Sequence, residues 1–194
     1  MTEYVQVRCP WSVNNPLLID YHDHEWGTPV HDEQKHFEFL TLEAMQAGLS
    51  WFIVLKKRES IRQAFDNFDY KKIAEYSDED SERILAAPDI IRNRRKIEAT
   101  IHNARMFLKV QQEFGTFDKY IWGFVNYQPI INSFTTMSET PVTTELSDRI
   151  SKDLKQRGFK FLGSTIIYAH LQAIGIVNDH LISCFRYEEL IISY

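Results

Sequence analysis

Four residues near the two ends of the chain have side chains that bind metal ions. Cys9 and His22 lie close to the N-terminus, and His180 and Cys184 are four positions apart, so that both would leave the same face of a helix. Two thiolates and two imidazoles form a closed tetrahedral set for structural zinc. The residues alone leave two interpretations, a zinc site that ties the ends of the chain together or buried side chains that fill the core.

Further ionisable groups crowd around His22. Asp23, His24 and Glu25 follow it directly, and a metallohydrolase centred on His22, Asp23 and His24 is an alternative to the four-ligand site. The two cysteines of the chain, Cys9 and Cys184, are not expected to form a disulfide in a reducing compartment.

A second chemical feature is Glu43, within the segment 37–57. Phe37, Leu40, Ala44 and Ala47 recur at helical spacing, and Glu43 falls on the edge of their apolar stripe. A buried carboxylate without a partner would protonate or destabilise the fold, so it needs a cation, donated hydrogen bonds or a functional role. The alternative is a partly exposed glutamate at the border of the stripe.

Aromatic residues surround Glu43 in sequence order. Tyr21, Trp26 and Trp51 flank its segment, and Trp11 follows closely after Cys9. Aromatic rings around a buried carboxylate would hold a flat, positively charged ring by stacking and cation–π attraction. Tryptophan and tyrosine also commonly pack the core, and this interpretation stays open.

Helices must position these residues, because helical periodicity and capping signals recur while strand signals are weak. Asp32 and Ser50 are expected to cap the two helices that flank the turn 46–50, and Ser77 is expected to start another. The sequence therefore predicts an all-α protein in which residues 1–31 form an irregular arm and 129–146 a loop. Helices are expected over 33–47, 51–65, 77–87, 91–115, 116–128, 147–157, 165–174 and from 178 through Cys184.

Composition agrees with a globular protein and limits how it could contact nucleic acid. The chain has 194 residues, 44% of them hydrophobic and 25% charged, with a net charge of −5, so a broadly basic surface is excluded. A nucleic-acid contact would have to be local. The turn and helix start over 88–96, which includes Arg92, could offer arginines and backbone amides to phosphates, although charge runs are commonly solvated helix faces.

The chain is expected to act in the cytoplasm and away from membranes. Its first residues lack the apolar core of a signal peptide, and no run approaches the ~20 apolar residues that a spanning helix needs.

Several stretches, taken together and in order, resemble the bacterial 3-methyladenine DNA glycosylase I family, of the constitutive type. They cover nearly the whole chain, and several spaced motifs in one order are far more specific than any single one. The stretches are Cys9-Pro10-Trp11, Tyr21-His22-Asp23-His24-Glu25-Trp26-Gly27, Leu42-Glu43 with Gln46-Ala47-Gly48-Leu49-Ser50-Trp51, Leu55-Lys56-Lys57-Arg58, Ile90-Ile91-Arg92-Asn93 with Lys96-Ile97, Phe124-Val125-Asn126, Lys155 with Gly158-Phe159-Lys160-Phe161, and Asn178-Asp179-His180 with Cys184.

The resemblance implies an all-α fold of the helix–hairpin–helix DNA glycosylase superfamily. Residues 1–194 would form a single domain of two packed helical subdomains with the base pocket between them. By this resemblance Cys9, His22, His180 and Cys184 are the ligands of a structural Zn²⁺ that joins the N- and C-terminal segments.

The same resemblance assigns the pocket. Glu43 becomes the catalytic carboxylate, and Tyr21, Trp51, Trp11 and Trp26 become substrate-binding residues.

Contacts with DNA are implied at Gly48, Leu49 and Arg92. Leu49 resembles the wedge that fills the gap left by an extruded nucleotide, and Arg92 lies in the segment that resembles the hairpin. This segment departs from the glycine-rich hairpin usual in the superfamily. Leu18 is a second departure, because some members carry a tyrosine there on the pocket side.

The implied activity is base excision. A monomeric enzyme would extrude 3-methyladenine from alkylated double-stranded DNA and hydrolyse its bond to the sugar, without a lysine nucleophile, leaving an abasic site. The alternative is a zinc-stabilised module that binds damaged bases or nucleic acid without turnover.

Overall fold

The computed structural model describes residues 6–193, and this part of the chain is predominantly helical, which confirms the expected class. In chain order the elements are α1 (Pro16–His24), α2 (Glu33–Gln46), α3 (Trp51–Ala64), the 3₁₀ turn η1 (Asp66–Phe68), α4 (Tyr70–Ala74), α5 (Asp78–Ala86), α6 (Arg94–Phe114), α7 (Phe117–Gly123), β1 (Ile130–Ile131), the 3₁₀ turn η2 (Met137–Glu139), α8 (Glu145–Gln156), α9 (Ser164–Ala173), β2 (Val177–Asn178) and α10 (Phe185–Ser193).

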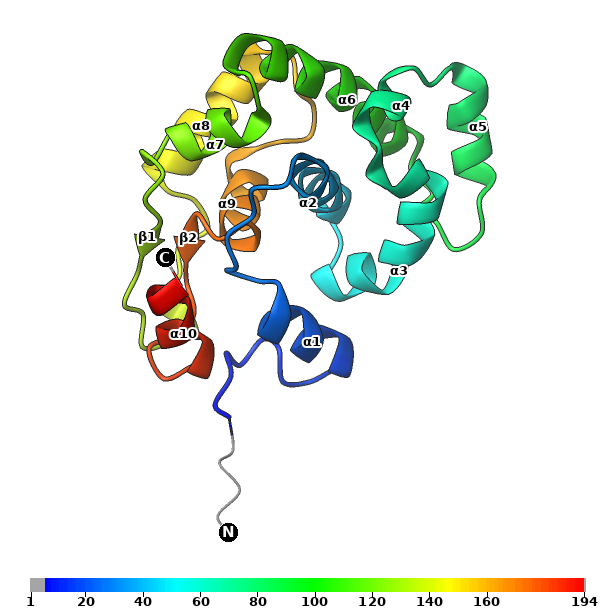
Figure 1. Ribbon diagram of the computed structural model, residues 1–194. Helices are drawn as coiled ribbons and strands as arrows, with labels where there is room; N and C mark the ends of the chain where they lie inside the picture. The colour runs from blue at the N-terminus through cyan, green and yellow to red at the C-terminus, as the bar shows by residue number, and fades with distance from the viewer. Residues whose placement is uncertain (1–5, 194) are drawn as a thin grey trace.

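Helix α2 lies at the centre of the molecule (Figure 1). It contacts α3, α6, α7 and α9, and every residue from His36 to Met45 is buried. A helix packed on all sides has no solvent-facing edge. The border of the apolar stripe on α2 is therefore buried as deeply as its centre.

The predicted helix starts are confirmed by their capping hydrogen bonds. The Asp32 side chain accepts a hydrogen bond from the backbone N–H of Lys35 at 2.8 Å, and Ser50 caps α3. Ser77 and Asp80 form a reciprocal capping box at the start of α5. These bonds satisfy backbone donors that have no partner within the helix.

The prediction of an irregular arm over residues 1–31 is wrong for α1. Asn15 caps this helix and Pro16 occupies its first position, where the fixed φ of proline favours helix entry. A proline at this position begins a helix rather than interrupting one. Residues 1–5 of the expected arm lie outside the described part.

The prediction of a final helix that carries His180 and Cys184 is also wrong. Strand β2 instead pairs in parallel with β1, in the register Ile130↔Val177 and Ile131↔Asn178, and α10 begins only after Cys184. The Asn178 side chain accepts a hydrogen bond from the His180 N–H at 3.1 Å, which holds the intervening segment in a turn. The two metal-binding side chains therefore come from a loop.

Three smaller differences concern connecting segments. Elements η1 and α4 occupy a stretch for which no helix was expected, and the expected loop 129–146 includes β1 and η2. The helix expected over 116–128 stops at Gly123, and the turn that follows contains Asn126 and Tyr127 with left-handed backbone angles. Between residues 6 and 193, none of the helices has both the length and the apolar character required to cross a membrane.

Candidate functional site

Glu43 is buried and faces a cavity. Only 3% of this residue is exposed, and it lines a cavity of about 390 Å³. Its Oε2 atom has no hydrogen-bond partner among the described residues, and burial raises the pKa of the carboxyl group to about 8. The interpretation of Glu43 as a partly exposed residue at the border of the stripe is therefore wrong.

The four aromatic residues expected near Glu43 all line the same cavity. The rings of Tyr21 and Trp51 have centroids 5.2 Å apart at 54°, and Trp11 meets Trp26 edge-on at 5.0 Å. Burial, together with the negative charge of Glu43, raises the pKa of Tyr21 far above its usual value, so its phenol stays neutral. Flat apolar faces around one carboxylate suit a planar cationic ring.

A further part of the cavity wall was not predicted from the sequence. It is formed by the loop around η2 and by one face of α9, through Met137, Thr140, Pro141, Val142, Thr165, Tyr168, Ala169 and Gln172. The four residues of α9 follow helical spacing, and this spacing could have identified a common face. The loop residues follow no period, so their contribution becomes visible only in the fold.

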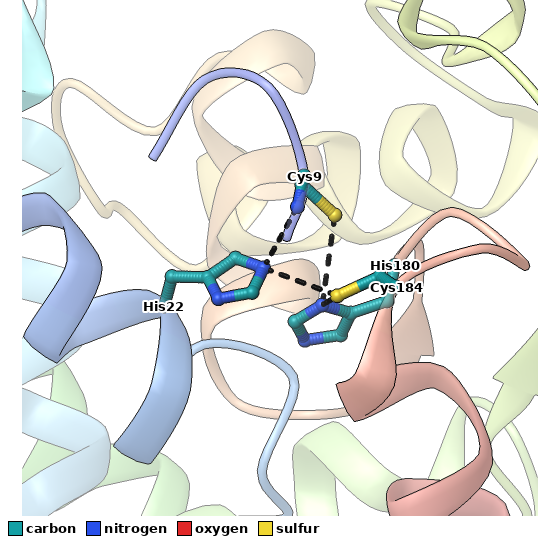
Figure 2. A group of neighbouring side chains, drawn as sticks. All are labelled: Cys9, His22, His180 and Cys184. Carbon is teal, nitrogen blue, oxygen red and sulfur yellow. Dashed lines mark hydrogen bonds between the residues drawn. The ribbon is translucent and has the colours of Figure 1, made fainter. Parts of the chain in front are cut away.

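The four predicted metal ligands come together at one buried point (Figure 2). Their donor atoms lie within 4.8 Å of one another. Sγ of Cys184 lies 3.4 Å from Nε2 of His22 and 3.5 Å from Nδ1 of His180, and Sγ of Cys9 lies 3.7 Å from the same Nδ1. This cluster could hold a metal ion.

The remaining nitrogen of each imidazole ring is held by a neighbour outside the cluster. His22 Nδ1 lies 2.7 Å from Asp23 Oδ1, and His180 Nε2 lies 3.0 Å from the carbonyl oxygen of Trp26. Asp23 is in turn paired with Arg8. These bonds orient each ring so that its other nitrogen faces the cluster, as metal-binding histidines require.

Asp179 connects this cluster to the cavity. It is 1% exposed and accepts hydrogen bonds from Tyr168 Oη at 2.6 Å, Gln172 Nε2 at 2.7 Å and Asn132 Nδ2 at 2.7 Å. Tyr168 and Gln172 belong to the cavity wall, and the next residue along the chain is His180. The position of this wall therefore depends on the segment that carries two of the four clustered side chains.

The turn that carries Gly48 and Leu49 lies between α2 and α3, beside the cavity residues Gln46 and Trp51. Gly48 has a φ of +78°, a conformation that glycine adopts without strain. The buried Lys96 donates hydrogen bonds from Nζ to the carbonyl oxygens of Met45, at 2.9 Å, and Ala47. Helix α6 therefore fixes the end of α2 and the start of this turn.

Arg92 is exposed in the segment 87–93 between α5 and α6. The same segment is bound to α3, because Lys57 Nζ donates to the carbonyl oxygen of Asp89 at 3.0 Å and pairs with its carboxylate. Arg92 does not line the cavity. It lies instead on the side of the molecule formed by α3, α5 and the start of α6.

The chain is similar to known proteins over most of its length. The profile of the family described as methyladenine glycosylase matches residues 11–187. DNA-3-methyladenine glycosylase 1 of Escherichia coli is 51% identical over 180 residues, which are 93% of this chain and 96% of that protein.

Solved structures agree with these matches. A structure of 3-methyladenine DNA glycosylase I from Staphylococcus aureus, described as the structural basis of 3-methyladenine recognition, has a TM-score of 0.90 and 37% identity and covers 93% of this chain and 96% of its own. A variant of a 3-methyladenine DNA glycosylase I in complex with 3-methyladenine also has a TM-score of 0.90, with 36% identity and coverage of 93% and 97%.

Proposed function

Because the chain belongs to the methyladenine glycosylase family, we propose that it excises 3-methyladenine from alkylated double-stranded DNA and leaves an abasic site. The observation that carries this proposal is the unpaired carboxylate of Glu43 in a cavity walled by aromatic rings. A base methylated at N3 carries a positive charge, and it supplies the partner that Glu43 lacks.

Recognition would combine charge and stacking. The extruded base would lie against Trp51 and Tyr21, with Trp11 and Trp26 behind them, and Glu43 would accept hydrogen bonds from the cationic ring. Stacking of a base on an aromatic side chain contributes ~1–3 kcal/mol. An unmodified adenine would keep the stacking and lose the attraction between charges, so the pocket would favour the damaged base.

The chemical step needs little more than binding and a water molecule. The bond between the sugar C1′ and the base N9 breaks, and its electron pair moves to the base, which leaves as a neutral molecule. Water adds to the electron-poor C1′ and releases a proton. Among the described residues that line the cavity there is no lysine, which supports a monofunctional hydrolase without a covalent amine intermediate.

Extrusion of the base would be supported by the turn after α2. Leu49 would occupy the space that the base leaves in the duplex, Gly48 would let the DNA backbone approach, and Arg92 would contact a phosphate. Helices α5 and α6 with the segment 87–93 would form the helix–hairpin–helix unit.

The metal cluster supports a structural Zn²⁺ held by Cys9, His22, His180 and Cys184. A sulfur and a nitrogen ligand of tetrahedral zinc would lie about 3.5 Å apart. Three of the four separations between sulfur and nitrogen atoms are 3.4–3.7 Å, and all donor atoms lie within 4.8 Å of one another. All four residues are buried, and four protein ligands close the coordination shell. Bound zinc would join the two ends of the chain, while the reaction takes place at Glu43.

The metallohydrolase alternative lacks this support. The His24 side chain is 71% exposed and its ring bonds to Asp20, whereas Asp23 contacts Arg8 and the outer nitrogen of His22. We further propose that residues 1–194 act as one domain, with the pocket between two helical subdomains, and that the enzyme is a monomer. Because its substrate is DNA, we place its activity in the cytoplasm.

An assay on methylated duplex DNA tests the activity. The expected product is free 3-methyladenine, and Glu43→Gln should reduce its release about 10- to 100-fold, because a hydrogen bond to a charged group contributes ~1.5–3 kcal/mol. Glu98→Gln, on the exposed face of α6, is the matched control and should release the base at the normal rate.

Two results would contradict the proposal. Tight binding of damaged DNA without release of a base would indicate that the protein binds damaged DNA but does not catalyse excision. Full activity of a correctly folded Glu43→Gln protein would show that the reaction does not require the Glu43 carboxylate.

A further inference from the structure

Three residues that line the cavity each have a buried polar side-chain atom without a hydrogen-bond partner. The buried side-chain atoms that lack a hydrogen-bond partner among residues 6–193 include Glu43 Oε2, Trp51 Nε1 and Thr140 Oγ1, and all three residues line the cavity. Such atoms are uncommon in folded proteins, because an unmade buried hydrogen bond is destabilising. Three of the seven such atoms among the described residues belong to side chains that line this one cavity, and the other four belong to His36, His170 and Arg186.

Thr140 is held firmly although its hydroxyl group is free. It ends the turn η2, where its backbone N–H donates to the carbonyl oxygen of Met137 at 3.3 Å. The preceding Glu139 accepts hydrogen bonds from the backbone and side chain of Thr135 at 2.9 and 2.6 Å, and Pro141 follows. The loop is therefore ordered by its own bonds, and the Thr140 hydroxyl group is not needed to hold it.

We propose that Thr140 contacts the substrate, its hydroxyl group forming a hydrogen bond with the extruded methylated adenine in the cavity that it lines together with Tyr21 and Trp51. This inference rests on the proposed function. The three free groups differ in chemistry, because a carboxylate accepts, an indole N–H donates and a hydroxyl group does both. An adenine offers an exocyclic amine that donates and ring nitrogens that accept, so it can satisfy all three types.

The role of Thr140 explains why the loop around η2 forms part of the pocket. A wall made only of Met137, Pro141 and Val142 would be apolar and would leave polar edges of the base without partners. Thr140 supplies one polar position within that wall. It would help to fix the orientation of a base that stacking alone would leave free to rotate in its plane.

Binding of free 3-methyladenine to the purified full-length protein, measured by calorimetry, tests this role. Thr140→Val keeps the shape and removes the hydroxyl group, and it should weaken binding about 3- to 10-fold, which is the contribution of one neutral hydrogen bond. Thr140→Ser restores a hydroxyl group and should bind nearly as the wild type does. Thr143→Val, at an exposed position of the same loop, is the matched control and should leave binding unchanged.

The Tm of each variant shows whether a change in binding is caused by a change in folding. Thr140→Val loses no hydrogen bond within the protein, so its Tm should equal that of the wild type; if it does not, Thr140→Ala is measured in its place. Equal affinity of the wild type and the hydroxyl-free variant would overturn the role of Thr140 while excision by the wild type continued. Failure of the wild type to bind or release 3-methyladenine would instead overturn the proposed function.

Discussion

Glu43 combines two opposing requirements in one residue. In the free protein its carboxyl group is buried without a partner, and burial raises its pKa to about 8, so that it holds a proton at neutral pH. A positively charged base in the cavity favours the ionised form of this group. With a cationic base in the cavity the same burial strengthens the attraction, because little water screens it. The protein is thus less stable without substrate so that it can recognise a charge.

This conflict predicts how stability depends on pH. The folded state keeps the proton of Glu43 up to pH of about 8, whereas the unfolded chain loses it near 4.5. Between these values the folded state binds more protons, so the free energy of unfolding decreases as pH rises. Glu43→Gln cannot ionise and should escape this loss, gaining up to ~5 kcal/mol over the wild type above pH 8 and almost nothing near pH 4.5.

Urea unfolding of both proteins at pH 5, 7 and 9 measures this difference directly. The comparison cancels other titrating groups, because both proteins share them. A difference that stayed constant from pH 5 to 9 would show that Glu43 has an ordinary pKa in the folded protein.

The sequence could identify Glu43 but only part of its surroundings. A carboxylate on the edge of an apolar helical stripe is visible in a local pattern, and Tyr21 and Trp51 lie near it in the motifs. Thr140 lies in a segment without periodicity, and only the fold brings it to the cavity that Glu43 of α2 also lines. Contacts between distant segments depend on the whole fold, which local patterns do not encode.

At the scale of elements, α2 presents two functional positions from one rigid support. Glu43 faces the cavity near the end of the helix, and the turn with Gly48 and Leu49 follows directly. Lys96 of α6 binds the last carbonyl groups of α2 and so fixes the turn relative to the cavity. The fixed position of α2 would then hold both Leu49, as the wedge in the duplex, and Glu43, in the pocket for the base.

Leu49→Ala should separate these two tasks. Leu49 does not line the cavity, so binding of free 3-methyladenine should be unchanged, while excision from duplex DNA should decrease at least ~10-fold because the extruded state loses its filler. Leu17→Ala, a partly exposed leucine on α1, is the matched control for loss of apolar surface. Equal loss of both activities would indicate a general distortion of the site.

Helices with strong caps could be predicted, and elements defined by tertiary contacts could not. Asp32, Ser50 and Ser77 mark helix starts through bonds to their own neighbours. The turn that carries His180 depends on the pairing of β2 with β1, which are far apart in sequence. A pattern of two residues four apart therefore predicted a helix where the chain forms a turn.

At the scale of the whole molecule, the metal cluster brings the N-terminal and C-terminal segments together. Cys9 and His22 come from the N-terminal part, and the other two side chains lie just before α10. The backbone N–H of Phe185 also donates to the carbonyl oxygen of Val7 at 2.9 Å. The residue types in the sequence suggested the four metal-binding side chains. Only the fold shows that the two segments that carry them lie together.

Metal content and metal removal test the cluster. The purified protein should contain one equivalent of zinc, and chelation should lower Tm by ~10 °C or more, because structural zinc contributes several kcal/mol. Cys184→Ser should reproduce this loss, whereas His24→Ala should leave metal content and Tm unchanged. A metal-free protein that kept its Tm but lost excision would favour a catalytic metal, and less than half an equivalent of zinc in a fully folded sample would contradict the site.

The positions of the four ligands in the sequence also determine when the cluster can form during synthesis of the chain. Synthesis proceeds at ~5–20 residues per second, so His180 and Cys184 emerge roughly 10–30 s after Cys9 and His22. During this interval the Cys9 thiol has no partner from the other end of the chain, and α9 lacks the Asp179 that anchors Tyr168 and Gln172. A growing chain therefore has an incomplete pocket, and this wall is anchored only after Asp179 has emerged.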